Sequence, residues 1–219
     1  MSSPDDKHID KYDDKYVQPG RYWPWVLLRA LPALVAAVVI TFSQDHSARL
    51  GFAMFGVLAL AGGIAVLLGA LRTLHPGVAR WCFVVQGILG VVLGAIALFS
   101  GSAGLPFLIF LVGAFAVLTG FLELYSGLRA RGRSDSARDW LFAGALTVLL
   151  AIVVLVVPAD YTQPFTGPDG VERALTASII LVGVLGAYAA ILGVYLVIAG
   201  LSLKWAPRAV AATAAESGS

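Results

Sequence analysis

Charged residues and cysteine are both scarce in this sequence. Asp, Glu, Lys and Arg account for 13% of its 219 residues, whereas soluble domains carry about 25%. Hydrophobic residues account for 59%, and the mean hydropathy is +0.86. The formal net charge is only +2 and no basic patch is interleaved with stacking aromatics, which argues against a nucleic-acid partner. The single cysteine, Cys82, excludes an intrachain disulfide and a cysteine-based metal cluster.

The sequence also lacks the motifs of common enzyme classes. It contains no Walker or dinucleotide-binding glycine loop, no GxSxG and no HExxH. The three histidines, His8, His46 and His75, lie in three different segments, so we expect them not to converge on a metal ion. We therefore predict a protein that is not an enzyme and that uses neither a cofactor nor a metal.

Six long apolar runs fill most of the chain. Each can cross a hydrocarbon core of about 30 Å as a helix, and unpaired backbone groups in lipid favour helices over strands. We predict an all-α, polytopic membrane protein whose transmembrane domain occupies 25–205. Its six spans lie at about 25–42, 50–71, 81–99, 105–128, 140–157 and 174–203. We expect disordered cytoplasmic tails at 1–24 and 206–219, and a tight turn at 167–170.

The basic residues predict the orientation of the spans. Most of the 15 Lys and Arg residues lie in the two tails or in the loops after spans two and four. The opposite side carries only Arg49 and Arg173. Because basic residues stay in the cytoplasm, we predict a multi-pass protein of the cytoplasmic (inner) membrane with both termini inside. The tryptophans are predicted to lie at this same boundary, which favours contact with anionic lipids: Trp23, Trp25, Trp81, Trp140 and Trp205.

Glycines recur seven residues apart in the even-numbered spans. Seven residues are about two helical turns, so each set lies near one face. The sets are Gly113, Gly120 and Gly127 in span four, Gly186, Gly193 and Gly200 in span six, and Gly62 and Gly69 in span two. We interpret them as helix-packing glycines of three repeated helical hairpins of roughly 55–65 residues, although chance matches remain an alternative in a glycine-rich chain. The even-numbered helices would then form the centre of the bundle.

The chain resembles the HdeD-like family of small integral membrane proteins with short repeated helical hairpins. The resemblance covers about residues 25–205 and is clearest in GFLELYSGLRAR (120–131), followed by RDWLFAGALTVLLAIVVLVVP (138–158). It implies a membrane protein associated with acid resistance in bacteria, in a family whose members mostly have no established activity. The external loop at 43–49 lacks the proline common in this family, and the loop at 158–173 is longer than usual.

Arg29 and Glu123 are the charged residues expected within the membrane. Such residues are costly in lipid and are therefore candidates for function. Both are expected near the same cytoplasmic depth, so they could pair with each other or extend separately to the lipid headgroups. Glu123 shares the glycine face of span four, which directs it toward a neighbouring helix.

Three functions are compatible with these features. The one we favour is a non-enzymatic membrane protein in acid or envelope stress tolerance. The second is a small proton or ion channel or transporter that uses Glu123. The third is an accessory subunit of a larger membrane complex, or a homo-oligomer, held through its lipid-facing surface.

Overall fold

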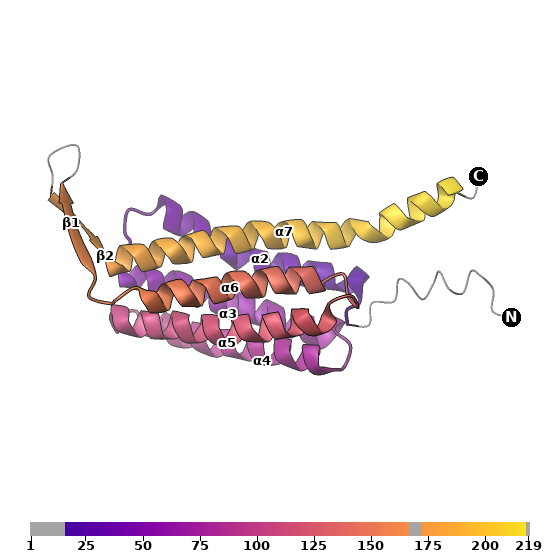
Figure 1. Cartoon of the computed structure of the whole chain (residues 1–219), viewed down its shortest axis with the longest axis horizontal. Coiled ribbons are helices and arrows are strands. Elements are labelled where there is room, and N and C mark those ends of the chain that lie inside the picture. Colours follow the sequence, from indigo (N-terminus) through magenta and orange to yellow (C-terminus); the bar gives the residue numbers. More distant parts are fainter. Residues whose placement is uncertain (1–15, 167–171, 218–219) are drawn as a thin grey trace.

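The computed structural model describes residues 16–166 and 172–217 (Figure 1). The turn expected at 167–170 and the tail at 1–15 lie outside the described residues. The described part consists of long helices and one two-stranded β-hairpin: α2 (Pro19–Phe42), α3 (Ala48–Thr73), α4 (Val78–Phe99), α5 (Leu105–Ala130), α6 (Ala137–Val156), β1 (Thr162–Thr166), β2 (Glu172–Thr176) and α7 (Ala177–Ser217).

The six described helices are each long and apolar enough to cross a membrane. The shortest span, in α6, has 20 residues, which corresponds to about 30 Å of helix. Large apolar side chains remain exposed around the outside of the bundle: Leu31, Val38 and Phe121 keep 58%, 55% and 65% of their surface. An apolar surface of this extent matches lipid rather than water.

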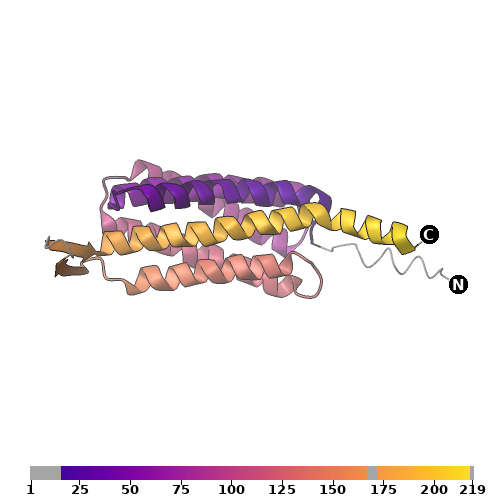
Figure 2. The ribbon, with the colours of Figure 1, turned by 90° about the horizontal axis from the view of Figure 1, so that it is seen from above.

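Helices that follow one another in the chain lie side by side, and α7 returns to pack along α2. Both views of the ribbon show this return (Figures 1 and 2). The six helices therefore form a closed ring of neighbours. We call the end of the bundle where α2 begins and α3 and α5 end the terminal end. The opposite end, which carries β1 and β2, is the hairpin end.

Three helix pairs meet at glycine seams. A Cβ added at Gly63 of α3 would lie 2.8 Å from a backbone oxygen of α4. A Cβ at Gly120 of α5 would lie 3.0 Å from a backbone nitrogen of α6, and one at Gly193 of α7 would lie 3.1 Å from a backbone nitrogen of α2. Glycine permits such close approach of two membrane helices because it carries no side chain. The seams therefore join α3 with α4, α5 with α6, and α7 with α2.

The sequence led us to predict that the even-numbered helices form the centre of the bundle. Their glycine faces do not meet one another there. Each lies against an odd-numbered span, and the tight pairs are not the consecutive hairpins that begin at the first span. The physical reason lies in α4 and α6, which supply small residues of their own. Gly90 meets the backbone of α3, and Gly144 meets the backbone of α5. Two facing smooth surfaces bring the helix axes closest together.

Most of the predicted packing glycines lie against a neighbouring helix, five of them in these seams and Gly69 against Trp25 of α2. Six would place a Cβ 3.0 Å or less from the neighbouring helix: Gly69, Gly120, Gly127, Gly186, Gly193 and Gly200. Gly113 is only in ordinary contact with Leu155, at 3.5 Å. The prediction for Gly62 was wrong, because a Cβ there would meet nothing within 4 Å. The neighbouring Gly63 faces α4 instead, since adjacent helical residues point about 100° apart.

The described chain is packed before the predicted start of the first span. Val17 is 1% exposed and bridges to Leu74, and the backbone N–H of Gln18 donates to the carbonyl of Thr73 at 3.0 Å. Helix α2 begins at Pro19, because proline suits the first helical turn. The predicted tail at 1–24 is therefore wrong for residues 16–24. At the other end, α7 continues to Ser217, where the sequence had predicted disorder from residue 206.

The β-hairpin lies in the connection between α6 and α7. Its strands are antiparallel, with Thr162 opposite Thr176 and Thr166 opposite Glu172. The β1 side chains are exposed. The hairpin therefore projects from the bundle at the hairpin end (Figure 1).

Candidate functional site

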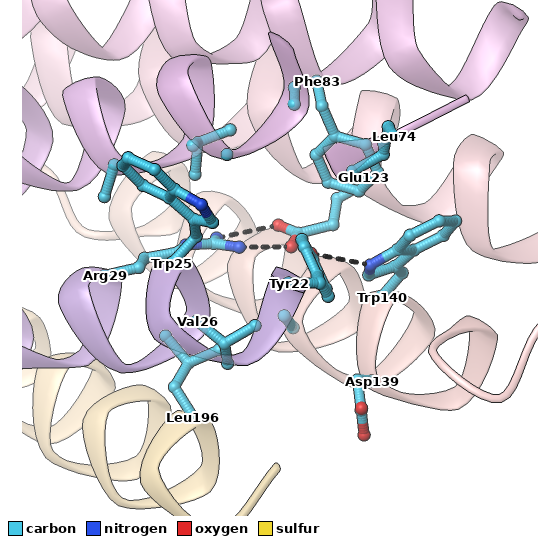
Figure 3. Close-up of a pocket in the computed structure, with 15 residues that line it drawn as sticks. Tyr22, Trp25, Val26, Arg29, Leu74, Phe83, Glu123, Asp139, Trp140 and Leu196 are labelled. Atoms are coloured by element: carbon cyan, nitrogen blue, oxygen red, sulfur yellow. Dashed lines mark hydrogen bonds and ion pairs between the residues drawn. The ribbon is translucent and has the colours of Figure 1, made fainter. Parts of the chain in front are cut away.

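The centre of the bundle contains an ion pair between α2 and α5. Arg29 Nη1 donates to Glu123 Oε1 at 2.6 Å, and Nη2 donates to Oε2 at 3.0 Å (Figure 3). Two parallel bonds of this kind fix both the distance and the plane of the partners. The Glu123 side chain is 1% exposed and that of Arg29 is 15% exposed. Of the two arrangements left open by the sequence, the side chains adopt the paired one.

Gln86 of α4 adds a third helix to this cluster. Its Nε2 donates to Glu123 Oε2 at 3.1 Å, and the residue is 4% exposed. Its other polar atom, Oε1, is buried and has no hydrogen-bond partner among the described residues. The sequence analysis did not associate Gln86 with Glu123. The signal that could have done so is the register of an internal sequence repeat.

An outer cavity of about 30 Å³ lies beside the ion pair, toward the terminal end. Arg29 and Glu123 line it together with Tyr22 and Trp140, and Trp140 Nε1 donates to the Tyr22 hydroxyl at 3.2 Å (Figure 3). Trp140 is 2% exposed. Trp140 lies in the first turn of α6, at the terminal end, but it is buried in the cavity wall, so the predicted contact with lipid headgroups was wrong for this tryptophan.

An inner cavity, also about 30 Å³, lies next to Gln86. It is lined by Arg29, Gln86 and Tyr188 as polar residues, and by Gly62 and Phe115 among the others. Each cavity has room for about one or two water molecules. The open space beside Gly62 is therefore part of a cavity rather than of a helix seam.

Apolar side chains fill the bundle nearer the hairpin end. The largest fully buried ones there are Phe52 and Phe55 of α3, Leu108 and Leu111 of α5, and Leu185 of α7. Phe55 packs edge-on against Phe115 at 5.4 Å between ring centroids. The polar cluster and its cavities therefore occupy the half of the bundle nearer the terminal end.

Two further polar contacts join α6 to α7. The Tyr195 hydroxyl donates to Asp139 Oδ1 at 2.8 Å, and the Tyr188 hydroxyl lies 3.0 Å from Thr147 Oγ1. These side-chain bonds occur where no glycine seam is present. Among the described residues there is no group of three His, Cys, Asp or Glu side chains placed to hold a metal ion.

One family model matches the chain twice. Its description is a short repeat of unknown function (DUF308), and the matches cover residues 28–99 and 85–156. Each match spans three helices, and the two begin 57 residues apart, at 28 and 85. In that register Arg29 corresponds to Gln86, so the two residues that bind Glu123 occupy equivalent repeat positions. No curated protein and no solved structure matches the chain.

Proposed function

The chain belongs to the DUF308 family of short repeats, which includes the HdeD-like membrane proteins, and from this membership we propose a non-enzymatic role in acid or envelope stress tolerance. In this proposal the protein is a multi-pass protein of the cytoplasmic membrane. Its acid-responsive group is Glu123, held by Arg29. The observation that carries the proposal is the bidentate ion pair buried among six apolar helices.

A buried ion pair is poorly explained by stability alone. Removing two charges from water costs several kcal/mol for each ion, and well-packed apolar residues in their place are often as stable or more so. When Glu123 takes up a proton, Arg29 keeps its charge and loses its partner. The ion pair between α2 and α5 is then lost, which loosens the contact between these two helices.

Protons would reach Glu123 through the outer cavity, which it lines with Arg29. The other titratable groups near this pair are Tyr22 on α2, Asp139 on α6 and Tyr188 on α7. Asp139, which also lines the outer cavity, accepts a hydrogen bond from the Tyr195 hydroxyl. Glu123 is thus the acidic group that faces an arginine directly.

The proposed orientation places the terminal end in the cytoplasm. It is supported by basic side chains stacked on aromatic rings at that end. Arg72 lies 5.3 Å from the Trp25 ring centroid, and Lys204 lies 4.9 Å from that of Trp23. Such pairs hold cations at headgroup depth, where anionic lipids bind them.

The test compares acid survival of cells that lack the protein and are complemented with the wild type, Glu123→Gln or Glu172→Gln. Glu172 lies on the exposed β2 strand and provides the same chemical change away from the bundle. We expect survival to fall to that of the deletion with Glu123→Gln and to stay at the wild-type level with Glu172→Gln. Equal survival of all three strains, at equal protein levels, would contradict the proposal.

A second candidate, proton or ion conduction, is favoured by the two cavities that flank the cluster. It predicts proton or ion flux in proteoliposomes that is present in the wild type and in Glu172→Gln and absent in Glu123→Gln. Absence of flux in folded wild-type protein would exclude this candidate while leaving the acid-survival test unaffected.

A further inference from the structure

Gln86, which lines the inner cavity, carries an acceptor that nothing in the described chain satisfies. This acceptor, Gln86 Oε1, is buried. Turning the amide over would not help, because Oε1 would then face the Glu123 carboxylate in place of Nε2, which now donates to it at 3.1 Å. A buried acceptor fixed in this way is costly unless a donor from outside the chain reaches it.

Tyr188, which lines the same cavity, supplies a second free acceptor. The single proton of the Thr147 hydroxyl is donated to the carbonyl of Ala143 at 2.8 Å. The bond between Thr147 and Tyr188, at 3.0 Å, must therefore be donated by Tyr188. The lone pairs of the Tyr188 oxygen then remain available to a donor within the cavity.

Space for that donor is left open by Gly62. A Cβ at Gly62 would meet nothing within 4 Å, and the glycine lines the inner cavity. In the 57-residue register the equivalent residue of α5 is Thr119, whose hydroxyl is turned back onto the carbonyl of Phe115 at 2.6 Å. A side chain of that size at position 62 would project into the cavity.

We propose that the inner cavity is a binding site for a water molecule that donates one hydrogen bond to Gln86 Oε1 and one to the Tyr188 oxygen. A neutral donor fits because Arg29 also lines the cavity and would repel a cation, while the Arg29–Glu123 pair is neutral as a unit. The water completes a hydrogen-bonded chain from Arg29 through Glu123, Gln86 and Tyr188 to Thr147. This deepens the proposed function and rests on it only for the role of Glu123.

Hydroxyl-radical footprinting tests for this water. An X-ray pulse converts a resident water molecule to a hydroxyl radical, and the radical oxidises the side chains around it. The protein is held in lipid nanodiscs at neutral pH. Phe115 and Tyr188 line the cavity, whereas Phe52 is 0% exposed and lines neither of the two cavities. We expect Phe115 and Tyr188 to be oxidised several-fold more than Phe52. Equal oxidation of these side chains in the wild type would overturn the proposal.

The matched variants are Gly62→Val, which fills the cavity, and Gly183→Val. A Cβ at Gly183 also meets nothing within 4 Å, but that residue is exposed on the outside of α7. We expect Gly62→Val to abolish the excess oxidation and to lower the melting temperature, because displaced water leaves two acceptors unsatisfied. Gly183→Val should change neither. A higher melting temperature for Gly62→Val would show a dry cavity and overturn the proposal.

Two features keep the test decisive. If Gly62→Val does not fold, Gly62→Ala adds only a methyl group and should reduce the excess oxidation in part; unchanged oxidation in folded Gly62→Ala would contradict the site. The footprint is measured at neutral pH and needs no acid response. A labelled cavity with no effect of Glu123→Gln on acid survival would therefore reject the proposed function alone.

Discussion

Arg29, Glu123 and Gln86 form one hydrogen-bonded polar group inside the apolar bundle. The carboxylate accepts three hydrogen bonds from side chains on two helices. Removing one partner of a buried ion pair costs about 3–5 kcal/mol, because the other charge stays behind unpaired. The loss of stability on replacing any one of these residues therefore depends on whether its partners are still present.

At this scale we predict that Glu123→Ala destabilises the protein by about 3–5 kcal/mol. The triple variant Arg29→Met, Gln86→Leu, Glu123→Leu should recover most of that loss, since no buried polar atom of the cluster remains. The measurement is reversible unfolding in mixed micelles, with the single variants measured beside the triple. A triple variant as unstable as the sum of its single variants would contradict this account.

The sequence made Arg29 and Glu123 easy to find and Gln86 hard to find. Charges are rare in the spans, so each one within a span is conspicuous. Whether the two would pair depends on how α2 and α5 are placed across the bundle, and no local pattern encodes that placement. Gln86 is uncharged, and only its register with Arg29 distinguishes it from other polar residues within the spans.

Among the helices, the seven-residue glycine spacing identified the smooth faces but not their partners. The spacing predicts a stripe on each helix. It does not predict that α4 and α6 carry facing small residues such as Gly90 and Gly144. The same limit explains Gly62, which a one-residue error in register had assigned to a packing face. The apolar runs predicted where each helix lies. They predicted less well the residues at which the helices begin and end, because caps and tertiary contacts determine those residues.

Adjacent glycines of α3 provide a test of the seam. A methyl at Gly63 would lie 2.8 Å from the Gly87 carbonyl oxygen, so α3 and α4 must separate. We predict that Gly63→Ala destabilises the protein by about 1–3 kcal/mol. Gly62→Ala should destabilise the protein less than Gly63→Ala, because its methyl meets no atom and alanine favours a helix. Thermal unfolding in nanodiscs measures both variants, and equal destabilisation would argue against the seam.

For the whole molecule, the ring of helices is built from three equivalent pairs, of which one is assembled from the two ends of the chain. The pairs are α3 with α4, α5 with α6, and α7 with α2. The central polar cluster breaks this equivalence. In the 57-residue register Arg29 corresponds to Gln86 and then to Ala143, and Glu123 corresponds to Val66. A nearly three-fold scaffold thus carries one asymmetric site.

Exchanging the two equivalent residues tests this view of the molecule. Arg29→Gln alone leaves the Glu123 carboxylate without a cation, and Gln86→Arg alone places a second guanidinium beside the first, so each single variant should be destabilised. The double variant Arg29→Gln, Gln86→Arg presents the same arginine and amide to Glu123 from exchanged helices. We predict that its melting temperature recovers most of the loss, because the repeat places both positions around one carboxylate.

The exchange also separates symmetry from simple charge balance. The control is Arg29→Gln combined with Val66→Arg. It restores the net charge, but its arginine stands at the position equivalent to Glu123, whereas the arginine of the exchange variant stands at the position equivalent to Arg29. Recovery in the exchange but not in the control requires the Arg29 and Gln86 positions to be interchangeable. If the loss in melting temperature of the double variant equals the sum of the losses of the two single variants, then Arg29 and Gln86 are not equivalent around Glu123. The three-fold description then fails at the site itself.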